Sequence, residues 1–583
     1  MRRLPLPNPA TVAECLRGSL FEQHLCALAE KILNRRVPLL GYEIPLGDEI
    51  CWRRDYIHDR ETPPVYLRRI PYLDFARAGD HKIIWELNRH QHLVVLAQAA
   101  VLTGRKDFTN ELFAQLESWL DQNPVGCGIN WTSALEVAFR GLSWIWIHHL
   151  AGDRMPTPLA SRWRRSLYHH GCFLENNLSI YFSPNTHLQG EALALHALGM
   201  LFGEARWQQR GTALMHQIME THVHPDGGHF EHSSYYHLYA TDMFLFHAVL
   251  DDPGREYLDK LRRMARYLWA LAAPGELPFF GDDDGGRLFY PFGNRARFAR
   301  ATLAACSAFL GDTPWHSDPG DLHEIAAWWL GNKSAGPPSD SPVSEFFPDS
   351  GIATMVEGGT QLTACVRAFG RGSAGHSHAH SLHFVLRHAG ETVLIDPGTY
   401  TYVSDPVWRD RFRGTAAHNT VRIDRRDQAD PSGPFRWANL PEIEMVDWKP
   451  QPWRLHARCR YRGLCHERRI IVQHGAVWIV DDVSGAGTHR MEQFWHVEAL
   501  LDRNPIRLPG GVRLIVPETQ TVEIEQGWRS PVPGVKEPHP VLRISVETEL
   551  PCRMAAVFDF RNDDTILRVE QDRLSLGDRE IRL

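Results

Sequence analysis

The stretch GNKSAGPPSDSPVSEFFPDSG, residues 331–351, divides the chain into two parts with different residue patterns. Glycine, proline and serine are concentrated here, and such clusters interrupt helices and strands and are typical of linkers. Helical periodicity precedes the stretch, and short alternating runs follow it. We therefore predict a helical domain over residues 1–330, a linker over 331–345 and a β domain over 346–583.

The part before the linker has the pattern of amphipathic helices. Apolar residues recur at i, i+3, i+4 and i+7, and several runs stop at a glycine, where helices commonly end. The runs cover residues 16–34, 81–104, 110–123, 132–152, 190–203, 211–223, 243–250, 257–273 and 295–311. Such helices predict stacked hairpins, and an incomplete (α/α) toroid is one such arrangement. A solenoid is the alternative, although the sequence shows no fixed repeat.

The part after the linker consists of short β-type runs. Turn residues separate them at intervals of ~8–12 residues, the spacing of an antiparallel sandwich. The runs cover residues 351–358, 361–370, 381–390, 391–398, 466–475, 476–485, 489–498, 511–518, 521–527, 541–549, 553–560, 565–572 and 573–577. The expected fold class is therefore α+β with several domains: an N-terminal incomplete (α/α) toroid followed by a C-terminal antiparallel β-sandwich.

Composition narrows the classes of function. The 583 residues are 43% apolar and 23% charged, as in ordinary globular proteins, and the net charge is −7. This negative charge argues against nucleic acid as a partner. An anionic substrate would need a local group of basic residues, because the overall field would repel it. Candidates are Arg89, Arg140, Arg409, Arg411 and Arg413, with Arg413 the first choice; pairing with a carboxylate such as Glu86 or Glu136 is the structural alternative.

Signals for targeting and for disulfides are sparse. No apolar run reaches ~18 residues, so we expect no membrane span. The N-terminus lacks the apolar segment of a signal peptide, and the ten cysteines are scattered without a CxxC motif. We therefore expect reduced thiols and a cytoplasmic location, or a periplasmic one if an N-terminal signal has escaped recognition. The oligomeric state cannot be inferred from the sequence.

The histidine-rich stretch GHSHAHSLHF carries most of the chemistry of the second half. In a β-strand alternate side chains share a face, so strand geometry would bring His376, His378 and His380 together. Asp396 ends a second apolar run, and His418 begins a third. Nitrogen and oxygen ligands from three strands suit zinc, and the combination predicts a metal site. His380 leaves the number of ligands open. Three protein ligands with a water, or four protein ligands, are both possible.

The helical half contains a capping motif with polar residues behind it. In SPNTHLQGEALALHALG, Asn185 stands where the N-cap of a helix would, and His187 and Glu191 would be i,i+4 partners on that helix. A cap and a side-chain pair are the structural interpretation of these three residues.

Two further segments of this half combine turns with titratable residues. DGGHFEHSSYYHLYATDM places Glu231, Tyr236 and His237 close together, which indicates the lining of a cleft or a hydrogen-bonded core. In ELPFFGDDDGGR, we expect Asp282, Asp283 and Asp284 to form an exposed acidic turn, since their spacing does not match a calcium loop.

Taken together, these motifs resemble those of the heparinase II/III-like polysaccharide lyases, and the resemblance runs over most of the chain. It is carried in the helical half by WELNRHQHL, INWTSALEVAFRGLSW, SPNTHLQGEAL, DGGHFEHSSYYH and LPFFGDDDGGR. In the β half it is carried by GHSHAHSLHF, LIDPGTY and RFRGTAAHNTV. No single string is decisive, but their order and spacing are specific. The family's fold, an incomplete (α/α) toroid and a β-sandwich, agrees with the pattern above.

The resemblance implies roles for particular residues. Asn185, with His187, would bind and neutralise a uronate carboxylate, and Tyr236 and His376 would be catalytic. The implied ligands of a structural zinc are His378, Asp396 and His418. Further substrate contacts are predicted for Glu191, Glu231, His237, Tyr400, Arg413 and Asn419.

The chain departs from the family pattern at two points. His380 stands where the family often has aspartate, which leaves the composition of the metal site open. Thr186 separates Asn185 from His187, which leaves open which of the two contacts the carboxylate.

The function expected from these features is cleavage of a uronate-containing polysaccharide or oligosaccharide by β-elimination, as a carbon–oxygen lyase. Three alternatives remain: a toroid glycoside hydrolase using Asp226, Glu231 or Asp282, a zinc hydrolase, and a polysaccharide-binding protein without turnover. Heparan sulfate, alginate, other glycosaminoglycans and bacterial exopolysaccharide are all compatible substrates.

Overall fold

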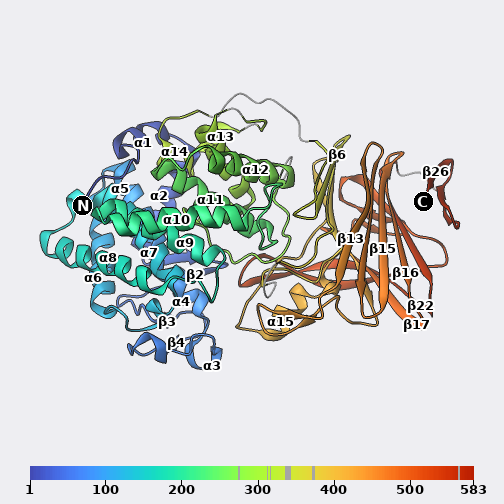
Figure 1. Cartoon of the computed structure of the whole chain (residues 1–583), viewed down its shortest axis with the longest axis horizontal. Helices are drawn as coiled ribbons and strands as arrows, with labels where there is room; N and C mark the ends of the chain where they lie inside the picture. The colour runs from blue at the N-terminus through green and yellow to red at the C-terminus, as the bar shows by residue number, and fades with distance from the viewer. Residues whose placement is uncertain (273–275, 312, 316, 335–342, 371–374, 562–564) are drawn as a thin grey trace. The chain divides into compact units, whose positions relative to one another are not determined.

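The computed structural model describes residues 1–272, 276–311, 313–315, 317–334, 343–370, 375–561 and 565–583. The chain forms two compact units (Figure 1). The helical unit comprises Met1–Val223, Tyr236–Arg266 and Gly285–Ser341. The β unit comprises His224–Tyr235, Tyr267–Asp284 and Pro342–Leu583.

The first part of the chain is built from helices and short hairpins. The helices are α1 (Pro9–Leu16), α2 (Leu20–Leu33), α3 (Phe75–Ala78), α4 (His81–Asn88), α5 (Gln91–Thr103), α6 (Lys106–Gln122), α7 (Ala134–Ala151), α8 (Thr157–Asn177), α9 (Thr186–Phe202), α10 (Ala205–His222), α11 (Ser234–Leu250), α12 (Arg255–Ala272), α13 (Phe298–Leu310) and α14 (Ala326–Leu330). Two hairpins accompany them: β1 (Arg36–Leu39) with β2 (Tyr42–Pro45), and β3 (Arg54–Asp55) with β4 (Arg60–Glu61).

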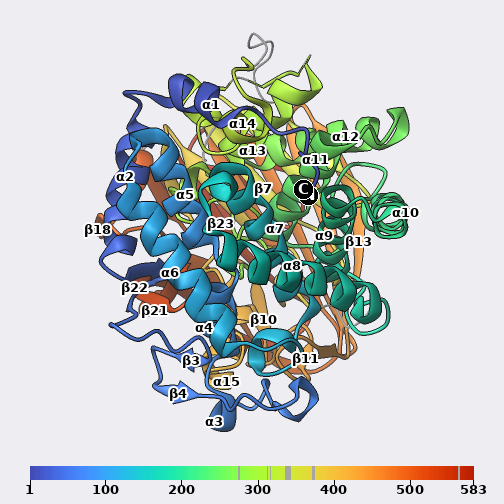
Figure 2. The same ribbon diagram turned by 90° about the vertical axis from the view of Figure 1, so that its left-hand side faces the viewer.

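Inner and outer helices alternate in this unit. α7 packs against α5, α8 and α9, and α9 packs against α8 and α10 (Figure 2). α7 and α9 are buried on almost every side, whereas α8 and α10 bury only one stripe. A helix that is apolar all round belongs in a core, and an amphipathic helix covers it. This two-layered arrangement confirms the predicted helical architecture.

The second part of the chain is made of antiparallel sheets. The strands are β5 (Glu345–Phe347), β6 (Ile352–Glu357), β7 (Thr360–Cys365), β8 (Phe384–His388), β9 (Glu391–Leu394), β10 (Val421–Ile423), β11 (Asp430–Pro431), β12 (Trp437–Ala438), β13 (Glu442–Pro450), β14 (Trp453–Tyr461), β15 (Leu464–Gln473), β16 (Ala476–Ser484), β17 (Thr488–His496), β18 (Asp502–Arg503), β19 (Ile506–Leu508), β20 (Val512–Ile515), β21 (Val522–Val532), β22 (Val535–Glu549), β23 (Cys552–Asp559), β24 (Leu567–Val569), β25 (Arg573–Leu576) and β26 (Arg579–Arg582), with one helix, α15 (Pro406–Arg413).

Three of these sheets enclose the main core. The largest has the order β13-β14-β15-β16-β23-β20-β19-β18, and the others are β5-β6-β7-β8-β9 and β10-β17-β22-β21. Phe384 of β8, Trp495 of β17 and Phe558 of β23 meet in the core, with ring centroids 5.7 and 5.2 Å apart for successive pairs. Burying such a ring contributes ~1.5–3 kcal/mol. These facing sheets confirm the predicted β-sandwich.

Several local expectations need correction. The histidine-rich stretch is not a strand: residues 376–383 form turns, Leu382 has a φ of 64°, and β8 begins only at Phe384. Periodicity did not identify α8, β13 or β14, because charged residues interrupt their apolar pattern. The predicted linker over 331–345 lies partly outside the described residues, between α14 and β5.

Two segments from the helical half of the sequence group with the β unit. They are His224–Tyr235 and Tyr267–Asp284. The first is held by Asp226, whose carboxylate accepts hydrogen bonds from the backbone N–H (2.8 Å) and hydroxyl (2.6 Å) of Ser350. These segments bring Glu231 and Asp282 into the β unit.

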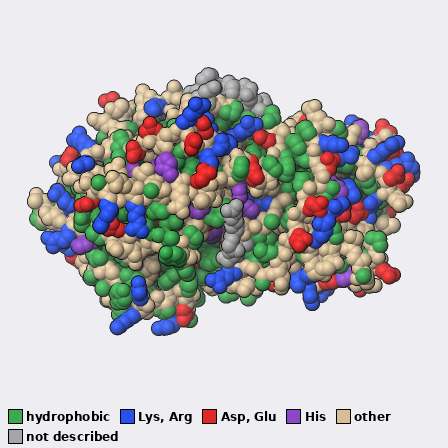
Figure 3. All heavy atoms as spheres, viewed as in Figure 1, with side chains coloured by type: hydrophobic (Ala, Val, Ile, Leu, Met, Phe, Trp, Pro, Cys, Tyr) green, Lys and Arg blue, Asp and Glu red, His purple; other side chains and the backbone are tan. Residues whose placement is uncertain are grey.

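The described residues also bear on membrane spans, thiols and surface charge. None of the described helices is long and apolar enough to cross a bilayer. All ten cysteines lie in the described part of the chain as free thiols. On the face shown in Figure 3, acidic and basic side chains are interspersed over each unit.

Candidate active site and metal centre

His376 lies between two carboxylates in the β unit. Its Nδ1 is 3.0 Å from Oδ2 of Asp282, and its Nε2 is 3.4 Å from Oε1 of Glu231. The side chain is almost fully buried. Burial lowers the pKa of His376, but the hydrogen bond to Asp282 and the charges of Glu231 and Asp282 outweigh it, so the pKa is raised above its usual value. The predicted catalytic histidine is therefore held in a polarised setting suited to proton transfer.

Asp282 is the residue whose role the sequence did not reveal. The expected exposed turn is wrong, because Asp282, Asp283 and Asp284 are all buried. The two terminal nitrogens of Arg409, Nη1 and Nη2, donate to the Asp282 carboxylate, Nη2 at 2.8 Å. Nε2 of His378 lies 2.9 Å from Oδ1 of the same carboxylate. Burial raises the pKa of Asp282, but Arg409 and the two histidines hold it well below its usual range. The Asp282 carboxylate thus contacts two imidazoles at once and orients both.

A glycine lets the Asp282 segment approach His376 closely. The backbone N–H of Asp282 donates to the carbonyl of His376 at 2.9 Å. Gly281 has a φ of +75°, and a Cβ at this position would lie 2.6 Å from that same carbonyl oxygen. Only glycine fits both the left-handed backbone and the contact. The Phe-Gly-Asp sequence therefore determines where the carboxylate lies.

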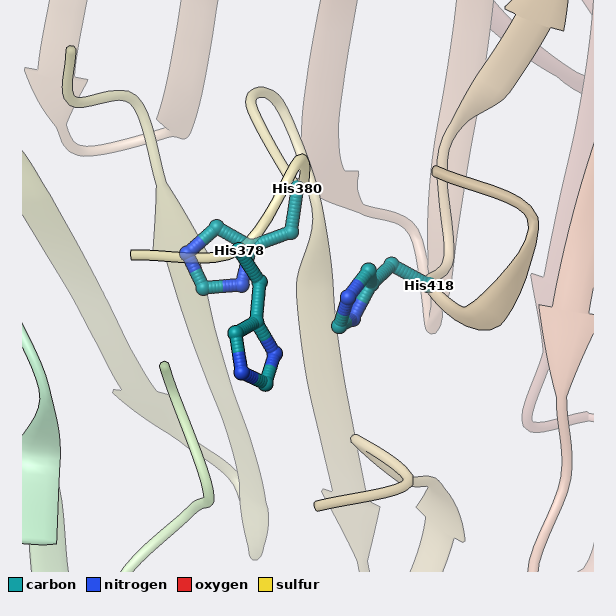
Figure 4. Close-up of side chains that lie close together, drawn as sticks. All are labelled: His378, His380 and His418. Carbon is teal, nitrogen blue, oxygen red and sulfur yellow. The ribbon is translucent and has the colours of Figure 1, made fainter. Parts of the chain in front are cut away.

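Behind His376, four histidines gather around Asp396 in the β unit. Two sets of three potential ligands lie within 4.8 Å: His378, His380 and His418, and His383, Asp396 and His418. Figure 4 shows the rings of the first set turned toward one another. All these side chains are buried. Clustered imidazoles in a dry site are what a transition metal such as zinc requires.

The fit to a metal is supported by unsatisfied nitrogen atoms. Four ring nitrogens of the cluster are buried in the described part of the chain without a hydrogen-bond partner: His378 Nδ1, His380 Nδ1, His383 Nε2 and His418 Nε2. Buried polar atoms normally have partners, and an unpaired one costs ~1–3 kcal/mol. The donor set therefore fits a metal ion. His383 was not among the candidate ligands predicted from the sequence. It joins this cluster because the backbone turns at Leu382, the preceding residue, which has a positive φ.

The predicted trio His378, Asp396 and His418 does not form one of the two sets. His418 belongs to both, His378 to one and Asp396 to the other. A metal centre in this place was predicted from the sequence, whereas the division of the ligands into two sets was not.

In the helical unit, Asn185 caps α9 as the pattern predicts. Its Oδ1 accepts the backbone N–H of His187 at 3.0 Å, so the amide nitrogen keeps its two donors for other partners. Both side chains are of intermediate exposure. Glu191, fully buried on the same helix, accepts from the N–H and the hydroxyl of Ser179, both at 2.6 Å. Burial raises the pKa of Glu191 to about 8.

Tyr236 and His237 occupy the first turn of α11 in the helical unit. Tyr236 is 5% exposed, and its ring centroid lies 6.3 Å from that of Tyr239. Nε2 of His237 lies 3.0 Å from the carbonyl of Met264, which ties α11 to α12. His237 therefore has a structural contact in addition to the substrate contact predicted for it.

The proposed basic residues are mostly paired. Arg89 makes a buried bidentate pair with Glu136, at 2.7 and 2.9 Å, as the structural alternative predicts. Arg140 donates to Nε2 of His170 at 2.9 Å, and burial lowers its pKa to about 9. Of the five arginines, Arg411 alone has an exposed side chain.

Three predicted substrate contacts in the β unit have structural settings. Arg413 is 1% exposed and donates to the carbonyl of Gly433 at 2.8 Å. The amide nitrogen of Asn419 donates at 2.9 Å to the carbonyls of Phe384 and Ile395. Tyr400 is partly exposed, and its ring stacks on Phe412 with centroids 5.6 Å apart. Arg413 and Asn419 hold loops together, and Tyr400 retains an accessible edge.

Comparisons with known proteins place the chain in a family. The model described as "Heparinase II/III N-terminus" matches residues 40–286, and "Heparinase II/III-like, C-terminal" matches residues 340–570. Heparin-sulfate lyases from Bacteroides stercoris and Pedobacter heparinus are each 21% identical, over 70% and 73% of this chain. The matches span 63% and 64% of those relatives, less than two thirds of their length.

A solved structure gives the same result for the fold. The crystal structure of a heparinase III superposes with a TM-score of 0.72 at 16% identity, covering 100% of this chain and 93% of the other. Identity this low supports the fold alone. With the two family matches together covering most of the sequence, the chain belongs to the heparinase II/III-like family.

Proposed function

We propose that the protein is a polysaccharide lyase that cleaves an acidic, uronate-containing polysaccharide or oligosaccharide by β-elimination. The observation that carries the proposal is His376, a buried imidazole held between Asp282 and Glu231. The names of the heparin-sulfate lyase relatives support a glycosaminoglycan or a similar polymer as the substrate.

The chemistry explains why such residues are needed. A uronate carries a weakly acidic C5 proton beside its carboxylate, and removing that proton adds a second negative charge. Hydrogen bonds to the carboxylate in a dry site stabilise this charge. The free amide donors of Asn185, with His187, are proposed to supply these bonds. A base then removes the C5 proton, and an acid protonates the oxygen leaving C4.

We propose that His376 and Tyr236 share the two proton transfers. An imidazole titrates near neutrality, whereas a tyrosine with a pKa near 10 costs ~4 kcal/mol to ionise at pH 7. The tyrosine is therefore better suited as the acid unless a cation lowers its pKa. Which residue acts as the base depends on whether the C5 hydrogen and the C4 oxygen are syn or anti in the substrate.

The metal is proposed to be a structural zinc. Histidine nitrogens favour a transition metal over calcium or magnesium. When bound, the ion would hold the neutral imidazoles of the cluster in fixed orientations. Asp282 contacts both His378 of the cluster and His376, so a rigid cluster would also fix the catalytic imidazole.

The glycoside hydrolase alternative receives less support. Such an enzyme needs one carboxyl that is protonated and another that is free to act on water or sugar. Asp226 is engaged by Ser350, and Asp282 is held as an anion by Arg409. Neither of these two is poised as a general acid, and Glu231, the third candidate carboxyl, lies 3.4 Å from Nε2 of His376.

An ultraviolet absorbance screen against uronate polysaccharides and their oligomers tests the proposal. Elimination creates a C4–C5 double bond conjugated with the carboxylate, which absorbs where the substrate does not. We expect a rise on one substrate class that disappears in His376→Ala. New reducing ends without absorbance would instead establish hydrolysis, and silence in both assays across the panel would favour a binding protein.

A further inference from the structure

A pocket of about 360 Å³ lies beside α15 in the β unit. It is lined by one side of α15, by residues 414–417 and Asp427, and by strands β10, β17, β21 and β22. Every lining residue belongs to the β unit, and His376, Glu231 and Asp282 are not among them. Pockets that bind small ligands have volumes of this size. The pocket is therefore distinct from the residues around His376.

α15 directs different side chains toward the active site and toward the pocket. Arg409 donates to the Asp282 carboxylate with both terminal nitrogens, Nη2 at 2.8 Å. Arg411 lies two residues further on, which turns its side chain ~200° around the helix axis. Trp408 shares the side of Arg411, because residues three apart are neighbours on a helix. The helix thus separates the guanidinium that holds Asp282 from the one that lines the pocket.

Arg411 is a cation without a carboxylate partner. Its side chain is exposed, and none of the carboxylates in the described part of the chain forms an ion pair with it. Its guanidinium carbon lies 4.8 Å from the centroid of the Trp408 ring. A cation–π contact positions the guanidinium without neutralising its charge. The hydrogen-bond donors of Arg411 therefore remain for a ligand.

The other charged side chains of the lining each have a partner. The pairs are Arg422 with Glu492 (2.6 Å), Glu525 with Arg543 (2.8 Å), Asp410 with Arg413 (2.9 Å), and Asp427 with the backbone N–H of Thr415 (2.7 Å). Burial also raises the pKa of Asp427, which favours its neutral form. Since the charge of Arg411 is left uncompensated, an anionic group is the ligand that matches the pocket.

Aromatic faces accompany this cation. Trp528 of β21 lines the pocket, and Trp408 meets it edge-on, with ring centroids 5.5 Å apart. Nζ of Lys536 of β22 lies 3.5 Å from the centroid of the Trp408 ring and 5.6 Å from that of Trp528. Trp528 and Lys536 are both partly exposed. An indole offers a flat apolar surface for one face of a sugar ring, while nearby cations attract an anionic substituent of that ring.

We propose that this pocket is a second binding site for an acidic saccharide, whose sugar unit carries a carboxylate or a sulfate. Arg411 binds the anionic group through parallel N–H···O bonds, and Trp528 packs against the ring. The inference rests on the proposed function for its ligand, because the polymer cleaved at His376 is the one that also occupies the pocket. Occupation of both sites would raise the effective concentration of polymer at the active site.

Affinity electrophoresis of a protein that cannot cut the polymer tests the site. His376→Ala is the background, and the gels contain heparan sulfate, alginate, hyaluronan, dextran sulfate or neutral dextran. We expect retardation by at least one acidic polymer and none by dextran. In this background Arg411→Glu and Trp528→Ala should each weaken binding at least ~10-fold, as expected for the loss of one charge-assisted or stacking contact. Trp528→Phe keeps an aromatic face and should stay within ~3-fold.

The polymers also distinguish the two anionic groups. Alginate and hyaluronan carry carboxylates without sulfate, and dextran sulfate carries sulfate without carboxylates. A loss on the first two assigns a carboxylate to Arg411, and a loss on dextran sulfate assigns a sulfate. The matched controls are Arg503→Glu, at an exposed arginine of β18, and Trp448→Ala, at a partly exposed tryptophan of β13, and both should bind normally.

Unchanged binding in folded Arg411→Glu and Trp528→Ala would overturn the site. An equal loss in Arg503→Glu, equal retardation by dextran, or no retardation by any acidic polymer would overturn it as well. Circular dichroism confirms folding, and if Trp528→Ala does not fold, Arg411→Glu decides. The absorbance screen of the wild-type protein is a separate readout. Absorbance with unchanged binding in Arg411→Glu keeps the lyase and rejects the site, whereas retardation without absorbance keeps the site and rejects the lyase.

Discussion

The Nδ1 atom of His376 lies 3.0 Å from Oδ2 of Asp282. The other oxygen of this carboxylate lies 2.9 Å from Nε2 of His378, and Arg409 donates to both oxygens. One buried anion therefore orients the proposed catalytic imidazole and a proposed metal ligand together. A shift of His378 at the metal site would therefore also move His376, because Asp282 contacts both rings.

We expect Asp282→Asn to impair both stability and activity. The substitution keeps the shape but leaves Arg409 buried without its counter-charge, and removing one partner of a buried pair costs ~3–5 kcal/mol. Urea denaturation should show this loss, and kcat should fall at least ~100-fold because His376 loses its orienting anion. Asp410→Asn, which affects the partly exposed partner of Arg413, is the control.

A double variant separates charge from catalysis. Asp282→Asn with Arg409→Gln removes both buried charges and should recover part of the stability without restoring kcat. Recovery of kcat along with stability would show that Asp282 acts only through folding.

His376→Ala and Tyr236→Phe should each lower kcat at least ~100-fold, because each removes a group that transfers a proton. Initial rates of double-bond formation at saturating substrate measure this directly. If both variants keep kcat within threefold of wild type, the catalytic assignment fails.

Glu191 should make stability fall as pH rises. Its pKa is raised from 4.5 to about 8 in the folded protein by burial. Below pH 4.5 both states are protonated; between 4.5 and 8 the unfolded state ionises first, so folding loses ~1.4 kcal/mol per pH unit. Glu191→Gln should remove this slope in urea denaturation from pH 5 to 8. An unchanged slope would assign the pH dependence to other groups.

Removal of the metal should lower the melting temperature and the activity together, because a structural ion stabilises the fold. Thermal denaturation and initial rates after graded chelation measure both, and restored zinc should reverse both. A zinc hydrolase would behave differently. Its activity would disappear on chelation while the melting temperature stayed unchanged, and the metal-loaded enzyme would give saturated products.

Two exposed aromatic residues precede Asn185. Tyr181 and Phe182 are 96% and 78% exposed, on a loop whose Ser179 is anchored by Glu191. Aromatic faces suit sugar rings, so Tyr181→Ala with Phe182→Ala should raise KM with kcat nearly unchanged. Leu20→Ala, also highly exposed, is the matched control. An unchanged KM on substrates of every length would exclude a sugar contact here.

The sequence pattern correctly predicted those structural elements that depend on residues close together in the chain. The N-cap of Asn185 follows from its own neighbours, and the helical and β patterns on either side of the linker follow from side-chain period. The strand expected at His376–His380 was wrong, because alternation in a polar segment also occurs in turns. α8 was missed because charged residues fill its outer face.

The sequence by itself determined the two-part architecture, the helix cap and the presence of imidazoles that suit a metal. The tertiary structure decided which carboxylates those imidazoles contact. Asp282 reaches His376 across 94 residues, and the hydrogen-bond partners of His378, His383 and His418 come from other segments. Periodicity describes neighbours along a helix or strand, whereas a buried charge is placed by the partners that compensate its desolvation.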